Sequence, residues 1–210
     1  MALLLPNSVF IHVPRTGGQW FRTCIANWEI EKPETEYERK EIGYHHCSRI
    51  DLVDIKNRLS FGFVRHPWTW IKSRWSHIKK KKENYTPTEN KYDQYFHECY
   101  ANSFETTLEN VCTKHPSLAT HTFEHMLLKC DFIGRMEDNP KSASILTRLC
   151  GEHIKPGYFS TPKLNTSTND FSSEDYRIPK DLKDKYLRFE TTILDKFYHA
   201  SLPPTFIWIR

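Results

Sequence analysis

Residues Phe10 to Arg22, FIHVPRTGGQWFR, combine an apolar run, a turn with two glycines and the beginning of a helical pattern. A strand that ends in such a turn and enters a helix directs several backbone N–H groups, and the positive end of the helix dipole, toward one point. That point binds an anion, most often a phosphate. Gly17 and Gly18 permit close approach of the backbone, and Arg15 adds a fixed positive charge. The pattern predicts an anion site, although an ordinary strand-to-helix turn with a surface arginine has the same features.

The absence of the dipeptide Gly-Lys argues against one kind of phosphate site, the Walker A loop. A Walker A loop needs Gly-Lys-Ser or Gly-Lys-Thr at the start of its helix, and the sequence contains no Gly-Lys. The magnesium-nucleotide site of a common kinase is therefore poorly supported. The loop is expected to bind its phosphate in another way.

A second chemical pattern lies in Phe61 to Trp75, FGFVRHPWTWIKSRW. An apolar strand ends at Arg65, and Pro67 stands where a helix can begin. The carboxyl end of a strand is where open α/β sheets bind their ligands, so Arg65 is a candidate ligand contact. Ser73 lies roughly opposite the apolar stripe of the helix, which comprises Trp68, Ile71, Trp75 and Ile78. A salt-bridged arginine and a solvated serine are the alternatives for these two residues.

The elements that must position these residues alternate along the chain. Short apolar runs predict strands at Ser8 to Val13, Leu59 to Val64 and Asp131 to Gly134. Helical patterns cover Gly18 to Trp28, Arg49 to Arg58, Trp68 to Lys80, Phe104 to Val111, Pro116 to Leu128, Lys141 to Cys150 and Asp181 to His199. Gly157 to Ile178 is expected to be a long surface loop. The alternation predicts an α/β fold with a central, mostly parallel sheet flanked by helices.

Composition sets the limits of these interpretations. A chain of 210 residues is long enough for one domain with a real core. Its net charge of +4 suits an anionic ligand but falls short of a dedicated DNA binder. The six cysteines form no Cys-x-x-Cys pair, which excludes a zinc ribbon and a thioredoxin motif. The short run ALLL near the start is too brief for a signal peptide or membrane anchor, so the expected location is cytoplasmic.

The two patterns together resemble the motifs of the sulfotransferases that use 3′-phosphoadenosine 5′-phosphosulfate (PAPS) as donor. VPRTGGQW resembles their 5′-phosphosulfate loop, and FVRHPWTWIKS resembles their 3′-phosphate motif, in which a serine follows the arginine by eight residues. DFIGRMED, Asp131 to Asp138, and the C-terminal stretch NTSTNDF to YLRFETTILDKFYH are similar to the carbohydrate-type branch. The resemblance implies a P-loop NTPase-like sulfotransferase fold, as a single domain over residues 1–210.

The resemblance also assigns roles residue by residue. It implies that the 5′-phosphate contacts Arg15, Thr16, Gly17, Gly18, Gln19 and Trp20, and that the 3′-phosphate contacts Arg65 and Ser73. Trp20 stands where some members stack the adenine, with a core position as the alternative. Arg15 replaces the usual lysine, which keeps the charge but cannot surrender a proton. Gln19 replaces a usual hydroxyl residue.

The base that accepts the proton of the acceptor hydroxyl is expected at His46, because the branch often carries His-x-Ser or His-x-Thr at this place. His45 is the reserve, and an acidic residue such as Glu41 or Asp51 is the third option. The adjacent His-His-Cys cannot all face one ion, so no metal is expected. The implied reaction is in-line transfer that leaves 3′-phosphoadenosine 5′-phosphate (PAP), with Arg15 and the loop amides stabilising the departing phosphate.

The acceptor is expected to carry a hydroxyl, with a carbohydrate favoured by the branch; no nucleic-acid or membrane partner is expected. The run Lys79 to Lys82 could attract an acidic acceptor or form a solvated helix end. Two rival functions stay open. One is a nucleotide or small-molecule kinase of related fold. The other is a non-catalytic module that binds RNA or polyanions through Lys72 to Lys82 and neighbouring aromatic residues.

Overall fold

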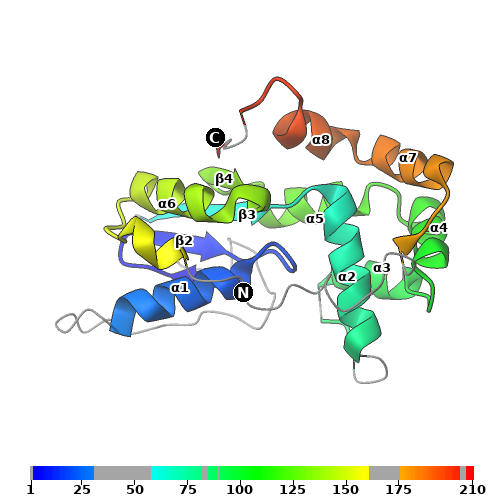
Figure 1. Ribbon diagram of the computed structural model, residues 1–210, viewed down its shortest axis with the longest axis horizontal. Coiled ribbons are helices and arrows are strands. Elements are labelled where there is room, and N and C mark those ends of the chain that lie inside the picture. Colours follow the sequence, from blue (N-terminus) through cyan, green and yellow to red (C-terminus); the bar gives the residue numbers. More distant parts are fainter. Residues whose placement is uncertain (1, 31–57, 82–84, 89, 161–175, 204–206) are drawn as a thin grey trace. The chain divides into compact units, whose positions relative to one another are not determined.

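The computed structural model describes residues 2–30, 58–81, 85–88, 90–160, 176–203 and 207–210. The chain divides into two compact units, and each is described by itself. The first comprises Met1–Arg65, His125–Leu164 and Ala200–Arg210, and the second His66–Glu124 and Asn165–His199. Figure 1 labels the α-helices of both units and the three central strands. The expectation of one domain over residues 1–210 stays a prediction.

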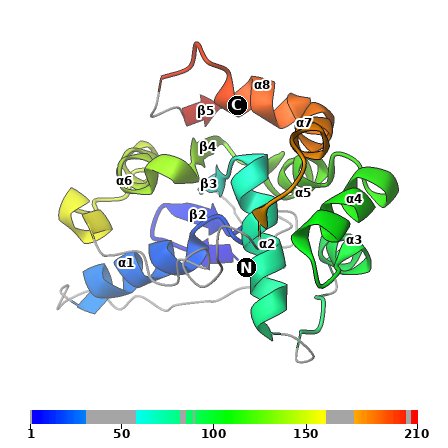
Figure 2. The same cartoon turned by 45° about the vertical axis from the view of Figure 1, so that its right-hand side comes forward.

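The first unit is built on a mixed five-stranded sheet. Its strands are β1 (Ala2–Leu4), β2 (Ser8–Ile11), β3 (Leu59–Val64), β4 (Phe132–Arg135) and β5 (Ile207–Ile209), in that order across the sheet. The three central strands are parallel, with Phe10 opposite Phe61 and Phe61 opposite Phe132. The edge strands β1 and β5 are antiparallel to their neighbours, and β5 beside β4 is visible in Figure 2. The predicted α/β class with a mostly parallel centre is confirmed, whereas both edge strands were missed.

Aromatic side chains form the core on one face of this sheet. Phe10, Phe61 and Phe63 are fully buried there, and the ring of Phe10 lies 4.5 Å from that of Phe21. Phe21 comes from helix α1 (Gly18–Ile30) and stacks on Phe159 from the short helix η4 (Pro156–Ser160), with centroids 6.1 Å apart. Helix α6 (Asn139–Leu149) adds Ala143 and Leu146 to the same core. Burial of this apolar area fixes α1, α6 and η4 on the sheet.

Two carboxylates hold the amino ends of the central strands. Asp131 accepts hydrogen bonds from the backbone N–H and the hydroxyl of Ser60, each at 2.7 Å. Glu152 accepts from the backbone N–H of Asn7 at 2.9 Å and from the hydroxyl of Ser8 at 2.7 Å. Hydrogen bonds to a charged acceptor are stronger than neutral ones, so these contacts set the positions at which β2 and β3 begin.

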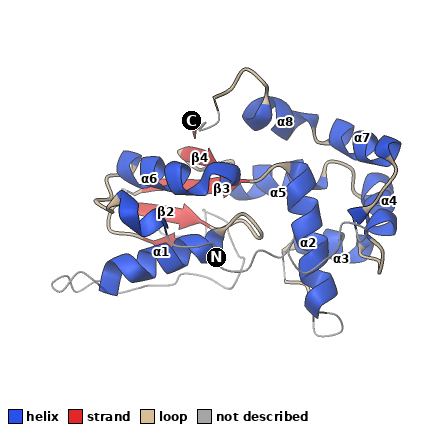
Figure 3. Ribbon diagram, viewed as in Figure 1, coloured by secondary structure: helices blue, strands red, loops and turns tan. Residues whose placement is uncertain are grey.

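The second unit is helical, as the colours of Figure 3 show for α2, α3, α4, α7 and α8. Its helices are α2 (Pro67–Lys81), α3 (Lys91–Cys99), α4 (Phe104–Lys114), α7 (Lys180–Phe189) and α8 (Thr191–Tyr198), together with most of α5 (Leu118–Leu127). The predicted α2 and α4 are confirmed, with one to three further residues at their ends. Helix α3 was missed. The predicted helix over Arg49 to Arg58 lies outside the described residues except for Arg58, which is not helical.

The helix predicted over Asp181 to His199 is in fact two helices, and they are separated at Glu190, whose side chain turns into the protein interior. Its side chain is fully buried and accepts hydrogen bonds from the backbone N–H groups of Ala119 and Thr120 and from the Thr120 hydroxyl. Burial raises the pKa of Glu190, although the hydrogen bonds from Thr120 and Ala119 act in the opposite direction. The carboxyl group thus caps the first turn of α5, and the chain changes direction between α7 and α8.

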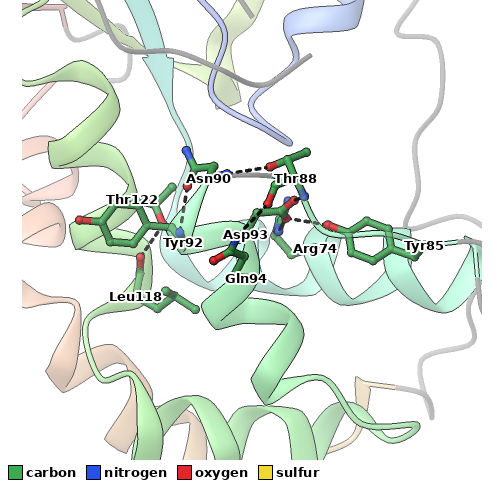
Figure 4. A network of polar contacts seen from close by, with 9 residues as sticks. All are labelled: Arg74, Tyr85, Thr88, Asn90, Tyr92, Asp93, Gln94, Leu118 and Thr122. Carbon is green, nitrogen blue, oxygen red and sulfur yellow. Dashed lines mark hydrogen bonds and ion pairs between the residues drawn. The ribbon is translucent and has the colours of Figure 1, made fainter. Parts of the chain in front are cut away.

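A buried ion pair joins α2 to α3 (Figure 4). The guanidinium of Arg74 donates to Asp93, and both side chains are nearly fully buried. Asp93 also accepts from the Tyr85 hydroxyl at 2.6 Å and from the backbone N–H of Thr88 at 2.7 Å. Burial alone would raise the pKa of Asp93, but Arg74 and these donors hold it well below its ordinary value. Burial raises the pKa of Tyr85 to about 12, so its hydroxyl keeps the proton it donates.

Substitution of Asp93 by Asn should lower the free energy of unfolding by about 3 kcal/mol, because Arg74 would remain buried without its counter-charge. Glu98→Gln is the matched control, since Glu98 pairs with His115 at 3.1 Å but is 58% exposed and should contribute less than about 1 kcal/mol. Urea unfolding measures both. Asp93 has a lowered folded-state pKa, so its contribution is present above its ordinary pKa of 3.8 and is lost as the pH falls further. Equal losses in the two variants would contradict this account.

Candidate functional site

The predicted anion loop lies in the first unit, between β2 and α1. The hydroxyl and the backbone N–H of Thr16 both donate to the carbonyl of Val13, at 2.8 and 3.3 Å, and this closes a tight turn. Arg15 and Gly17 have positive φ angles of 68° and 81°. The helix then begins at Gly18, and its first turn closes with the bond from Phe21 N–H to the Gly17 carbonyl at 3.0 Å. The strand, turn and helix predicted from the sequence are confirmed, and the first N–H groups of α1 lie at the end of this turn.

The two glycines of the loop are required by the packing of the protein itself. A Cβ atom on Gly18 would lie 2.0 Å from the imidazole of His12, and one on Gly17 would lie 2.5 Å from the side-chain nitrogen of Asn139. Real Cβ atoms do not approach other atoms so closely. From the sequence, both glycines are expected to permit the approach of a ligand. The structure adds a reason internal to the fold, because His12 and Asn139 occupy the space of the missing side chains.

Arg65 lies beside this loop. It follows β3, and its guanidinium donates from Nη1 to the backbone carbonyl of Arg15 at 3.1 Å. The contact arises because β2 and β3 are parallel neighbours, so their carboxyl ends meet at one edge of the sheet. The structure thus brings together Arg65 and the loop of Arg15, which are fifty residues apart in sequence. Two arginines and a helix N-terminus contribute positive charge at this edge, and Glu137 and Asp138 follow β4 at the same edge.

Asn139 is a residue at this loop that the sequence analysis missed. It opens helix α6, its side chain is fully buried, and neither its amide oxygen nor its amide nitrogen has a hydrogen-bond partner among the described residues. A buried polar group without a partner costs about 1–3 kcal/mol, so such groups concentrate at sites with a function. Its only sequence signal is its position directly after the DFIGRMED stretch. Asn139 places one donor and one acceptor against Gly17.

The other predicted contacts of the loop differ in exposure. Thr16 is fully buried and its hydroxyl bonds to Val13, whereas the Gln19 side chain is exposed. Trp20 is 3% exposed and belongs to the aromatic core, with its ring 6.3 Å from that of Phe159. This packing is what the core interpretation of Trp20 requires, and a contact with adenine stays a prediction.

The remaining predicted site residues lie elsewhere. Ser73 belongs to the second unit, in α2, and is buried, which does not fit a solvated serine. His45 and His46 lie outside the described residues, as do Glu41 and Asp51. Of the long loop expected at Gly157 to Ile178, the first residues belong to η4 and residues 161–175 are outside the described part.

Among the described residues, no group of three or more His, Cys, Asp or Glu side chains is arranged to hold a metal ion. The described cysteines, Cys24, Cys99, Cys112, Cys130 and Cys150, are buried free thiols. Burial raises the pKa of Cys99 to about 11 and that of Cys150 to about 12, which leaves both protonated and poorly nucleophilic at neutral pH.

None of the described helices combines the length and the apolar character that crossing a membrane requires. Comparison with protein-family models, with curated proteins and with solved structures gave no match.

Replacement of Gly18 by Ala should destabilise the protein by roughly 1–3 kcal/mol, because the new methyl group collides with the His12 ring. The sign of this change in stability is informative, because Gly→Ala within a helix otherwise stabilises a protein by about 1 kcal/mol. Gly157→Ala is the matched control, because a Cβ atom there meets nothing within 4 Å. Denaturant unfolding of both variants measures the difference. A Gly18→Ala variant as stable as the control would show that the loop has more room than its packing indicates.

Proposed function

We propose that this protein is a PAPS-dependent sulfotransferase of the carbohydrate-type branch, built on a P-loop NTPase-like fold. The observation that supports it most is the contact of Arg65 with the Arg15 carbonyl. Both residues belong to motifs that resemble phosphate sites of this family, one for the 5′-phosphosulfate and one for the 3′-phosphate. A donor with phosphates on both sides of one ribose needs two such motifs close together.

The 5′ end of the donor is proposed to lie on the loop from Arg15 to Trp20. Backbone N–H groups at the start of α1 bind the phosphate, and the side chain of Arg15 neutralises charge on its oxygens. The Asn139 amide, which has no hydrogen-bond partner among the described residues and lies against Gly17, supports this assignment because it adds polar atoms from a second element beside the loop. Gln19 is exposed at the same turn and can hydrogen-bond a ligand without being required for the fold.

The chemical step is proposed to be in-line transfer of the sulfuryl group. His46 takes the proton of the acceptor hydroxyl, the acceptor oxygen bonds to sulfur, and the bond from sulfur to the bridging phosphate oxygen breaks. Arg15 and the loop N–H groups stabilise the charge that develops on the departing 5′-phosphate of PAP. The proposal assigns no metal to this step, and His45 is the second candidate for the base. The acceptor is a hydroxyl compound, with carbohydrate as the first class to screen.

PAP should bind far more tightly than AMP, because only PAP has the 3′-phosphate that Arg65 is proposed to hold. A charge-assisted hydrogen bond contributes roughly 1.5–3 kcal/mol, which corresponds to an affinity difference of about tenfold or more. Isothermal titration calorimetry with PAP, AMP and magnesium-ATP measures this. Arg65→Ala should remove most of the preference for PAP, whereas Arg148→Ala, an exposed arginine of the same unit, should not. Equal affinity for AMP and PAP refutes the donor assignment, and tight binding of ATP favours the kinase alternative.

Arg15→Ala should lower kcat by about 10²–10³-fold and change the donor KM much less, because the charge acts mainly on the transition state. Arg15→Lys should retain substantial activity. The two variants share the positive φ of 68° at this position, so the comparison separates the lost charge from the conformational cost of a side chain there. Transfer of labelled sulfate to a panel of glycan and phenolic acceptors is the assay. A higher KM with unchanged kcat would reduce Arg15 to a binding residue.

A further inference from the structure

Two lysines of the second unit converge on one tryptophan. The ammonium nitrogen of Lys72, in α2, lies 5.0 Å from the centre of the Trp68 ring, and that of Lys183, in α7, lies 5.1 Å from the same centre. Lys72 also lies 4.7 Å from the centre of the Tyr176 ring. These four residues are called the lysine–tryptophan cluster. Two ammonium groups within about 5 Å of one indole concentrate positive charge on a small surface.

The part of the chain that the structure describes places no acid against the two lysines of the cluster. Among the described residues, neither Lys72 nor Lys183 is within salt-bridge distance of a carboxylate. Burial lowers the pKa of Lys72, and the charge of Lys183 lowers it further. Like charges held together cost free energy in the absence of an anion, so binding an anion here relieves a repulsion that the fold imposes.

The aromatic part of the cluster is held in place by packing. The Trp68 ring packs against Phe104 with centroids 5.7 Å apart and against Tyr186 at 6.3 Å. The hydroxyl of Tyr176 is hydrogen-bonded to Ser76. Trp68 and Tyr176 are nevertheless only half-buried, so part of each ring faces solvent. Rings that are fixed before a ligand arrives lose little conformational entropy when it binds.

Another lysine of the same helix provides an internal comparison. Lys79 lies 4.3 Å from the centre of the Trp75 ring, a cation–π contact like that of Lys72. Trp75, however, is fully buried, whereas the Trp68 ring of the cluster is half-buried. A cation–π contact is therefore common to both places, and the two differ in how far the indole is exposed to a ligand.

We propose that the lysine–tryptophan cluster is a binding site for an oxyanion, such as a sulfate, carboxylate or phosphate group, carried on a ring that packs against Trp68. The lysines bind the anion, and the indole and phenol rings contact the flat face of the ring that bears it. Acidic sugars and nucleotides share this chemistry. The inference does not depend on sulfuryl transfer, since it concerns binding alone.

The test follows the lysines directly by NMR, after reductive methylation with ¹³C-labelled formaldehyde. A disulfated disaccharide, its unsulfated counterpart and PAP are each titrated into the full chain, without donor or turnover. We expect the sulfated sugar to shift the Lys72 signal saturably and to raise its pKa, and the unsulfated sugar to leave it unchanged. Lys72→Met and Lys183→Met should each weaken the binding about tenfold or more. Lys79→Met is the matched control and should leave the affinity within twofold of the wild type.

Each outcome decides the proposal. If only PAP shifts Lys72, and Lys72→Met weakens PAP binding, the oxyanion site stands and its ligand is a nucleotide. If neither the sulfated sugar nor PAP shifts the Lys72 signal, the cluster is an ordinary solvated surface and the proposal is wrong. The same conclusion follows if Lys79→Met weakens the binding as much as Lys72→Met. Circular dichroism of each variant confirms that it is folded. Failure of sulfuryl transfer with intact binding here would count against the proposed function alone.

Discussion

The parallel pairing of β2 with β3 is the constraint on which the candidate site depends. Phe10 opposite Phe61 fixes the register, and the two strands therefore end at the same edge of the sheet. Everything chemical in the first unit follows that edge: the loop after β2, Arg65 after β3, and the turn and helix after β4 that bring Asn139 to Gly17. A different register would move Arg65 relative to the loop by about 3.3 Å per residue, which is enough to lose the contact with the Arg15 carbonyl.

The interior of the first unit explains why the loop can be so tightly built. Aromatic rings from β2, β3, α1 and η4 fill one side of the sheet, and two carboxylates fix the beginnings of the central strands. The strand that leads to α1 is thus fixed at its beginning by a carboxylate and along one face by aromatic packing. Glycine is then the residue that fits where the chain passes His12 and Asn139, and the helix N-terminus is presented in a fixed direction. Preorganised donors of this kind suit the binding of an anion, because no reorganisation accompanies the binding.

The sequence predicted the central elements well because their signals are local. The run Leu59 to Val64 is mostly apolar and bounded by polar residues, and it forms β3 with the same bounds. The edge strand Ala2–Leu4 was missed although its partner β2 follows directly in the sequence, because a run of three apolar residues is too short to show a strand period. Glu190 interrupts an apolar stripe that is continuous at helical spacing, and only the position of α5 reveals why. Asn139 gave no signal beyond its position after DFIGRMED, since its burial against Gly17 depends on how β4, α6 and the loop pack together.

The backbone of Arg15 has a consequence for how the protein can change. A side chain at φ of 68° costs about 1–2 kcal/mol relative to glycine, so this position carries a charged residue against its conformational preference. Selection for thermal stability alone would therefore drive position 15 toward glycine, and the loop would become more stable while losing its fixed cation. A charged residue in this backbone conformation therefore points to a demand on the loop other than folding. The residue found at position 15 therefore distinguishes selection for stable folding from selection for ligand binding.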